Sequence, residues 1–121
     1  MDESAIPRTN FERGLDYTRR NQNDQAVLMY VQVLKKDPHH AGAWSQLGAI
    51  YYDQGNYGLA IQKFKRGLKY KPDHFILNNN IAGAYYKQGN NKRARWHWEK
   101  CLEVDPGNES VLGQLKMLNE D

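Results

Sequence analysis

Four histidines and one cysteine are the side chains of this 121-residue chain that are best suited to metal binding or nucleophilic chemistry. The histidines lack the pairing at positions i and i+4, beside a carboxylate, that a helical zinc site uses. They are His39, His40, His74 and His97. Cys101 shares a column of small residues with Val33 and Gly67, which indicates a buried thiol. No phosphate-binding loop or Ser-His-Asp set can be placed, so we expect no catalytic residue, no metal and no cofactor.

Composition and charge narrow the class of protein. The chain is 40% hydrophobic and 26% charged, which is too apolar for a disordered segment and too polar for a membrane protein. A single cysteine and a first segment without an apolar stretch favour a reducing compartment, so we expect a cytoplasmic location and no membrane insertion. The net charge of +3 is uneven, with −1 over 1–53, +8 over 54–101 and −4 over 102–121.

The elements that would position any binding residues follow an internal repeat of 34 residues. Six columns of similar residues stay in phase across three copies without a gap. The columns are Gly14, Gly48 and Ala82; Tyr17, Tyr51 and Tyr85; Ala26, Ala60 and Ala94; Tyr30, Phe64 and Trp98; Leu34, Leu68 and Leu102; and Pro38, Pro72 and Pro106.

Each copy contains two segments with apolar residues at three- and four-residue spacing, which predicts a pair of helices. In the second copy Gly55 falls in the turn between them, and Pro72 ends the second helix because proline cannot continue one. The small residues Gly48 and Ala60 would let the two helices approach closely. Neither helix can bury its apolar stripe alone, so the copies must stack. The expected helices cover 9–20, 24–36, 41–54, 57–70, 75–88, 91–104 and 109–119.

The second copy also contains the pattern W-x2-L-G-x2-Y, then A-x3-F, then P. Its residues are Trp44, Leu47, Gly48, Tyr51, Ala60, Phe64 and Pro72. This pattern resembles the signature of the tetratricopeptide repeat (TPR) family. The resemblance implies an all-α fold, a right-handed superhelical solenoid of helix–turn–helix repeats. It divides the chain into an N-terminal tail over 1–6, repeats over 7–40, 41–74 and 75–108, and a C-terminal capping helix over 109–121.

Members of this family are mostly non-catalytic and hold a peptide or a helix of another protein. The resemblance therefore implies an adaptor, scaffold or assembly factor whose first helices line a concave groove. Gln46, Asn80 and Gln114 recur there at one-repeat intervals, and their amides offer donors and acceptors to an extended peptide. The alternative is that they are ordinary polar groups on a wet surface. The flanking groove residues are Phe11, Arg19, Ser45, Tyr52, Asn79, Tyr86 and Lys87.

Some family members grip the C-terminal carboxylates of heat-shock chaperones with basic and asparagine side chains. The matching positions in this chain contain no Lys or Arg, so we expect no chaperone-tail binding by that mechanism. These positions are Phe11, Leu15, Gln46, Ile76 and Asn80.

The second helices offer another candidate surface on the convex face. Leu28, Val31 and Trp96 fall where water is expected, which would suit a protein interface, unless Trp96 folds over a neighbouring residue or under the C-terminal cap. One alternative function is a homo-oligomeric scaffold that self-associates through this face and the C-terminal helix. Another is an RNA-binding helical repeat that uses the basic segment 54–101. The neutral, amide-rich groove argues against nucleic acid.

Overall fold

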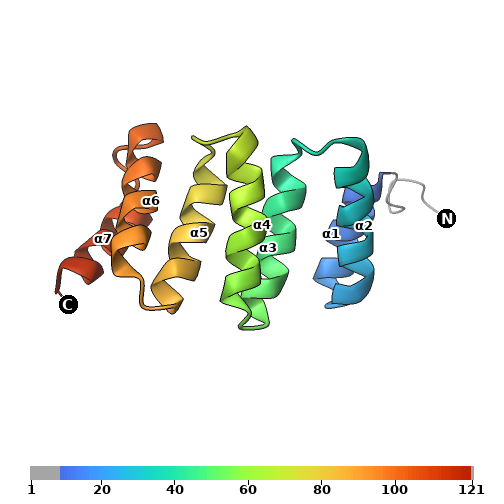
Figure 1. Cartoon of the computed structure of the whole chain (residues 1–121), viewed down its shortest axis with the longest axis horizontal. Coiled ribbons are helices and arrows are strands. Elements are labelled where there is room, and N and C mark those ends of the chain that lie inside the picture. Colours follow the sequence, from blue (N-terminus) through green and yellow to red (C-terminus); the bar gives the residue numbers. More distant parts are fainter. Residues whose placement is uncertain (1–8, 121) are drawn as a thin grey trace.

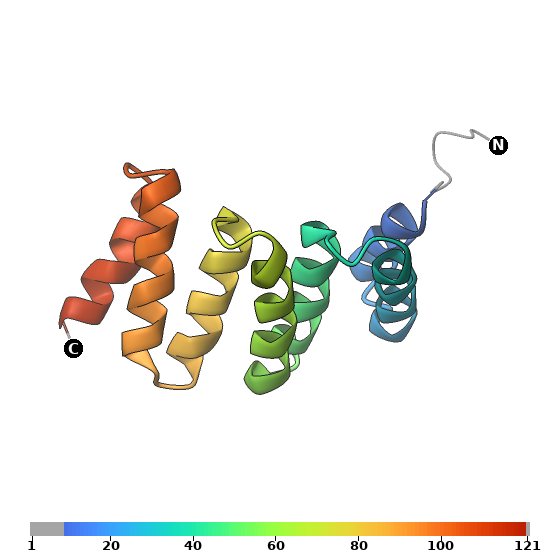
Figure 2. The ribbon, with the colours of Figure 1, turned by 45° about the horizontal axis from the view of Figure 1, so that its top comes forward.

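The computed structural model describes residues 9–120 and shows seven helices and no strand in that range. The helix pairs stand side by side in chain order, with the first pair, α1 and α2, at one end and α7 at the other (Figure 1; Figure 2). Each helix begins and ends within one residue of its expected bounds. The helices are α1 (Asn10–Arg19), α2 (Asn23–Lys36), α3 (Ala41–Asp53), α4 (Tyr57–Tyr70), α5 (Phe75–Lys87), α6 (Asn91–Val104) and α7 (Glu109–Glu120). The expected tail over 1–6 lies outside the described residues, as do residues 7, 8 and 121.

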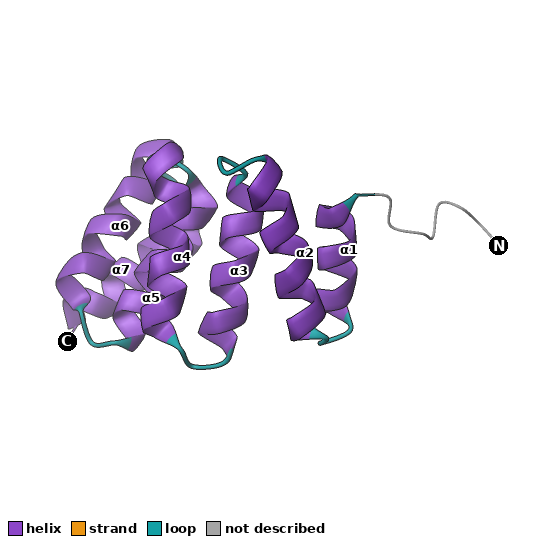
Figure 3. Cartoon of the chain, turned by 45° about the vertical axis from the view of Figure 1, so that its right-hand side comes forward, coloured by secondary structure: helices purple, strands orange, loops and turns teal. Residues whose placement is uncertain are grey.

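Short loops join the helices (Figure 3), and the loop conformations repeat with the sequence. The turns after α1, α3 and α5 each contain one residue in the left-handed region, namely Asn21 (φ 60°), Gly55 (φ 79°) and Gly89 (φ 81°). Glycine adopts this conformation without a steric cost, and asparagine tolerates it. The left-handed residue therefore recurs every 34 positions and turns each first helix back along the second.

Side chains cap the starts of most helices, and these caps recur with the same period. The N-cap residues of the first helices α3 and α5 are His40 and His74, whose Nδ1 atoms accept hydrogen bonds from backbone amides three residues later at 2.9 and 3.3 Å. The N-cap residues of the second helices α4 and α6 are Asn56 and Asn90, whose Oδ1 atoms do the same at 3.2 Å each. A cap satisfies a backbone N–H that the helix itself leaves unpaired.

Within each helix pair, a small residue faces a large aromatic ring. A Cβ atom added at Gly14 would lie 2.5 Å from Cε1 of Tyr30, and one added at Gly48 would come still closer to Phe64. Tyr30, Phe64 and Trp98 occupy one column of the repeat and are all buried. The close approach of the two helices predicted from Gly48 is therefore confirmed, and the aromatic ring fills the space between them.

The core consists of two buried clusters joined along the stack. One cluster lies among α1, α2 and α3 and contains Tyr30, Leu47 and Ile50, while the larger one runs from α3 to α7. Trp44 packs against both clusters. The all-α repeat solenoid expected from the sequence is thereby confirmed. Within residues 9–120, no helix has both the length and the apolar character required to cross a bilayer.

Candidate functional site

A hollow on the side of the first helices lies between α3, α5 and α7, and we call it the groove pocket. Its volume is about 300 Å³, and two residues of the second helices, Phe64 and Trp98, close its base. The other lining residues are Ala49, Tyr52, Asp53, Asn79, Asn80, Gly83 and Gln114. The stacking of α3 and α4, α5 and α6, and α7 is what brings these residues from positions 49 to 114 into one place.

Two members of the predicted amide series lie in the groove pocket. Asn80 and Gln114 line it and are half-buried, and neither side chain forms a hydrogen bond with another group of residues 9–120. Gln46 is also half-buried and also lacks such a bond, but it does not line the pocket. An amide that lacks a protein partner retains both its donors and its acceptor for a ligand.

The base of the groove pocket is shaped by the smallest residue in it. A Cβ atom added at Gly83 would lie 3.9 Å from the nearest atoms of Tyr52, which is an ordinary van der Waals distance. The Tyr52 ring is held edge-on against Tyr57, with 5.3 Å between centroids. Asn79 accepts a hydrogen bond from Trp98 Nε1 at 3.0 Å, so its carbonyl is already used. The pocket thus combines a fixed aromatic wall with unpaired amides.

The remaining residues predicted for the groove lie outside this pocket. Ser45 is 7% exposed, and its hydroxyl donates to the Gly42 carbonyl at 3.0 Å. Phe11 packs against His40 and lines a different hollow between α1 and α2. The roles of these residues in binding stay predictions. The other three placements are Arg19, paired with Asp16 at 3.4 Å; Tyr86, packed on Trp98 at 6.1 Å; and Lys87, exposed at the end of α5.

The three convex-face candidates are exposed in the structure but do not form one patch. Leu28 is 60% and Val31 36% exposed on α2, whereas Trp96 is 56% exposed on α6. The helix α4 stands between α2 and α6 (Figure 1). The Trp96 ring contacts His97 and lies under the Lys100 ammonium, 5.6 Å from its centroid. Their use as an interface stays a prediction.

Three of the histidines have structural roles that the residue types alone did not indicate, whereas the buried thiol predicted for Cys101 is confirmed. His40 and His74 are helix caps, and His39 stacks on the Tyr70 ring with 4.0 Å between centroids. Burial raises the pKa of the Cys101 thiol to about 11, so the thiolate that a nucleophile requires is disfavoured. A signal for the caps was present in the sequence, because His40, His74 and Asn108 recur at an interval of 34.

Comparisons with known proteins place this geometry in a family. The family model described as "Tetratricopeptide repeat" matches residues 11–69 and 46–100, which together cover most of the chain. The chain therefore belongs to the tetratricopeptide repeat family, whose fold is known as a non-catalytic protein-interaction module. No enzyme family is indicated by the match.

Two curated relatives share part of the sequence. Superkiller complex protein 3 of Homo sapiens is 35% identical over 54 residues, and that of Mus musculus is 33% identical over 54 residues. Each match covers 45% of this chain and 4% of the relative, so the chain spans only a small fraction of their length.

Solved structures show the same fold at low sequence identity. "First TPR of Spaghetti (RPAP3) bound to HSP90 peptide SRMEEVD" has a TM-score of 0.86 at 16% identity, over 92% of this chain and 88% of that chain. The second TPR domain of human RPAP3, in complex with the HSP70 peptide SGPTIEEVD, has a TM-score of 0.84 at 16% identity, over 93% and 94%.

Proposed function

We propose that this chain is an adaptor, scaffold or assembly factor that binds an extended peptide segment of another protein in the groove pocket. The observation that carries this proposal is the pair Asn80 and Gln114, whose amides line the pocket and have no hydrogen-bond partner within residues 9–120. The backbone of an extended peptide offers alternating N–H and C=O groups to such amides. The two RPAP3 structures, which contain an HSP90 and an HSP70 peptide, support a peptide as the kind of ligand.

The charge of the pocket argues for a peptide that does not end in a carboxylate cluster. Asp53 is the charged side chain that lines it, and the positions that match the family's carboxylate clamp contain no Lys or Arg. A peptide such as the acidic SRMEEVD would bring like charge towards Asp53 without a cation to receive it. We therefore expect this chain to bind a neutral or basic segment in preference to such a tail.

The test is an affinity capture followed by a quantitative binding measurement. The wild-type chain and an Asn80→Ala, Gln114→Ala variant are compared, with Gln25→Ala, Gln32→Ala as a matched control that truncates two exposed amides on α2. We expect the first variant to weaken binding of a captured segment at least tenfold, at about 1 kcal/mol for each hydrogen bond lost. Equal binding by all three chains would exclude the groove pocket as the site.

The division of the chain follows the helix pairs. We propose repeats over 7–40, 41–74 and 75–108, each with one of the pairs α1–α2, α3–α4 and α5–α6, and a capping helix over 109–121 that corresponds to α7. Val111 and Leu118 of α7 are buried against the last pair, which supports a capping role. A cytoplasmic location, self-association and RNA binding stay predictions from the sequence.

A further inference from the structure

A second hollow, which we call the α4–α6 hollow, lies between the second helices of two consecutive repeats. Its volume is about 250 Å³, and it is lined by Lys65 of α4, Tyr85 of α5, and Arg93, Trp96 and His97 of α6. Tyr85 is buried and His97 half-buried, so they form its base. Lys65, Arg93 and Trp96 are exposed and surround it.

The base of the α4–α6 hollow is fixed and uncharged. Asn78 donates through Nδ2 to the Pro72 carbonyl at 2.9 Å, so its Oδ1 is the atom that faces His97 Nδ1, also at 2.9 Å. His97 must then hold its proton on Nδ1, which leaves Nε2 as an acceptor. The Tyr85 ring stacks on the imidazole at 5.7 Å between centroids.

The rim of the hollow is positive and unneutralised. Arg93 donates to the Tyr85 hydroxyl at 3.4 Å and lies over its ring, and neither Arg93 nor Lys65 forms an ion pair with any group of residues 9–120. The pKa of His97 is lowered to about 4, mainly by burial and then by the charges of Lys65 and Arg93. The fields of both cations therefore reach the base of the hollow.

The preceding repeat shows which residues can occupy the equivalent positions of this surface. The positions of Lys65, Arg93 and Trp96 are occupied 34 residues before by Val31, Leu59 and Gln62. The same helix packing is thus compatible with uncharged residues at both cationic positions. Because packing does not require the cations, their convergence beside an exposed indole is a local feature of this junction.

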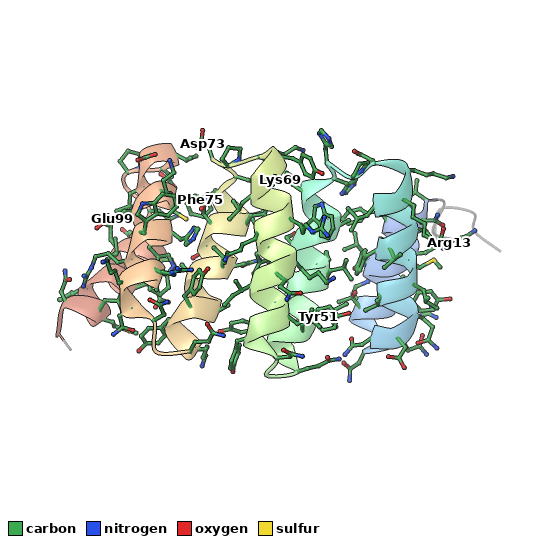
Figure 4. All side chains as sticks on the ribbon, in the orientation of Figure 1. Arg13, Tyr51, Lys69, Asp73, Phe75 and Glu99 are labelled. Atoms are coloured by element: carbon green, nitrogen blue, oxygen red, sulfur yellow. The ribbon has the colours of Figure 1, made fainter. Side chains whose placement is uncertain are left out.

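The extent of the positive surface indicates the kind of ligand. Lys100, which lies over the Trp96 ring, is held by Asp73 at 3.5 Å and Glu103 at 3.1 Å. Figure 4 shows Asp73 beyond the upper end of α4 and Glu99 on the edge of α6 away from α4. Asp73 and Glu103 neutralise Lys100 and so interrupt the positive area on that side of the hollow, whereas a nucleic acid presents phosphates along its whole length.

We propose that the α4–α6 hollow binds an acidic segment of a partner protein, with a carboxylate between Lys65 and Arg93 and an apolar side chain against Trp96. This contact uses a different surface from the groove pocket and does not depend on it. A charge pair at an interface guides the partner to its site, and an exposed tryptophan supplies apolar area for the contact.

The test begins with a chemically defined probe. A capped eight-residue peptide of alternating glutamate and leucine is titrated into the ¹⁵N-labelled chain at 150 mM salt, beside the same peptide with glutamine for glutamate. We expect the amide signals of residues 65 and 93 and the Trp96 indole signal to shift with the glutamate peptide, and the glutamine peptide to bind at least tenfold more weakly. Shifts centred on Asn80 and Gln114 instead would overturn the proposal.

The variants follow from the repeat itself. Lys65→Val, Arg93→Leu installs the residues of the preceding repeat, and Lys35→Gln, Lys116→Gln removes the same charge from two exposed sites elsewhere. We expect the first variant to lose affinity at least tenfold and the second less than twofold.

Three results would contradict the proposal: equal losses in both variants, tighter binding of a single-stranded oligouridine at the hollow, or a concentration-dependent dimer that covers it. Circular dichroism confirms that each variant is folded, and Lys65→Gln alone replaces the first variant if it is not.

Discussion

Asn78 forms a hydrogen bond that a tryptophan forms at the equivalent position of the preceding repeat. The second repeat has Trp44 at this position, and its Nε1 donates to the Pro38 carbonyl at 2.8 Å. In the third repeat Asn78 Nδ2 donates to the Pro72 carbonyl at 2.9 Å, the same acceptor one period later. The space that the indole would have filled lets Asn78 reach His97 as well. A buried amide with every bond made holds that imidazole in one tautomer.

His97 makes the stability of the fold depend on pH. Its pKa is lowered to about 4 by burial, Lys65 and Arg93, whereas an unfolded histidine titrates near 6.5. Between these values the unfolded chain binds more protons, so stability is unaffected above about pH 6.5 and falls as the pH drops towards 4. We expect a loss of about 1–2 kcal/mol for this partly exposed group.

Urea unfolding at pH 7.5 and pH 4.5 measures this loss in the wild type and in His97→Gln, which retains a donor for Asn78. The difference between the two pH values should shrink in the variant. His74, whose pKa is also lowered, is present in both chains and so cancels from the comparison. An identical pH dependence in the two chains would exclude His97 as the source.

For the groove residues, the sequence predicted positions along the helices but not the contacts of the side chains. The 34-residue period placed Asn80 and Gln114 at equivalent positions, because a period fixes which side of a helix a residue occupies, and both residues line the groove pocket. The period could not show that the Ser45 hydroxyl donates to the Gly42 carbonyl of its own helix, or that Asn79 accepts a hydrogen bond from Trp98. Those choices depend on side-chain distances that no spacing encodes. The binding role of the groove residues therefore stays a prediction, and Asn80 and Gln114 are the positions at which to test it first.

The helices and turns are the level at which the sequence was most informative. Proline or glycine lies at every junction except the α1–α2 turn, where Asn21 takes the left-handed position, and each helix has the bounds expected within one residue. The effect of proline and glycine on the end of a helix is local, so it can be recognised without knowledge of the packing. The histidine caps were not predicted, because histidine is not among the side chains that usually cap helices.

A comparison of Gly55→Ala with Gly58→Ala tests whether the turn after α3 requires a left-handed residue. The φ of Gly55 is 79°, and no atom lies within 4 Å of an added Cβ, so Gly55→Ala is strained only through the backbone. We expect it to lower the free energy of unfolding by about 1–2 kcal/mol. Gly58→Ala lies in the first turn of α4, also in open space, and is expected to be neutral or stabilising by up to about 1 kcal/mol. Chemical denaturation distinguishes the two, and equal effects would show that the turn is not constrained.

At the level of the whole molecule, Trp44 is the link between the two clusters of the core. We expect Trp44→Ala to cost about 3 kcal/mol, because a large contact is removed from both clusters. Hydrogen exchange should then accelerate in α1 and α2 more than in α5 and α6, since each repeat is stabilised mainly by its neighbours. Trp96→Ala removes an exposed indole instead and should cost less than about 1 kcal/mol. Uniform acceleration along the chain in Trp44→Ala would contradict this link.

The arrangement of α1 and α7 at opposite ends of the stack has a mechanical consequence. Tension applied between the two ends would load the helix-pair junctions in series, so each junction would carry the full force. The α6–α7 junction is less extensively packed than the α2–α3 and α4–α5 junctions, so α7 would detach first. Because Gln114 of α7 lines the groove pocket, the pocket would lose one wall at that step. Under load the chain would behave as a clamp that releases what it holds as soon as it begins to lengthen.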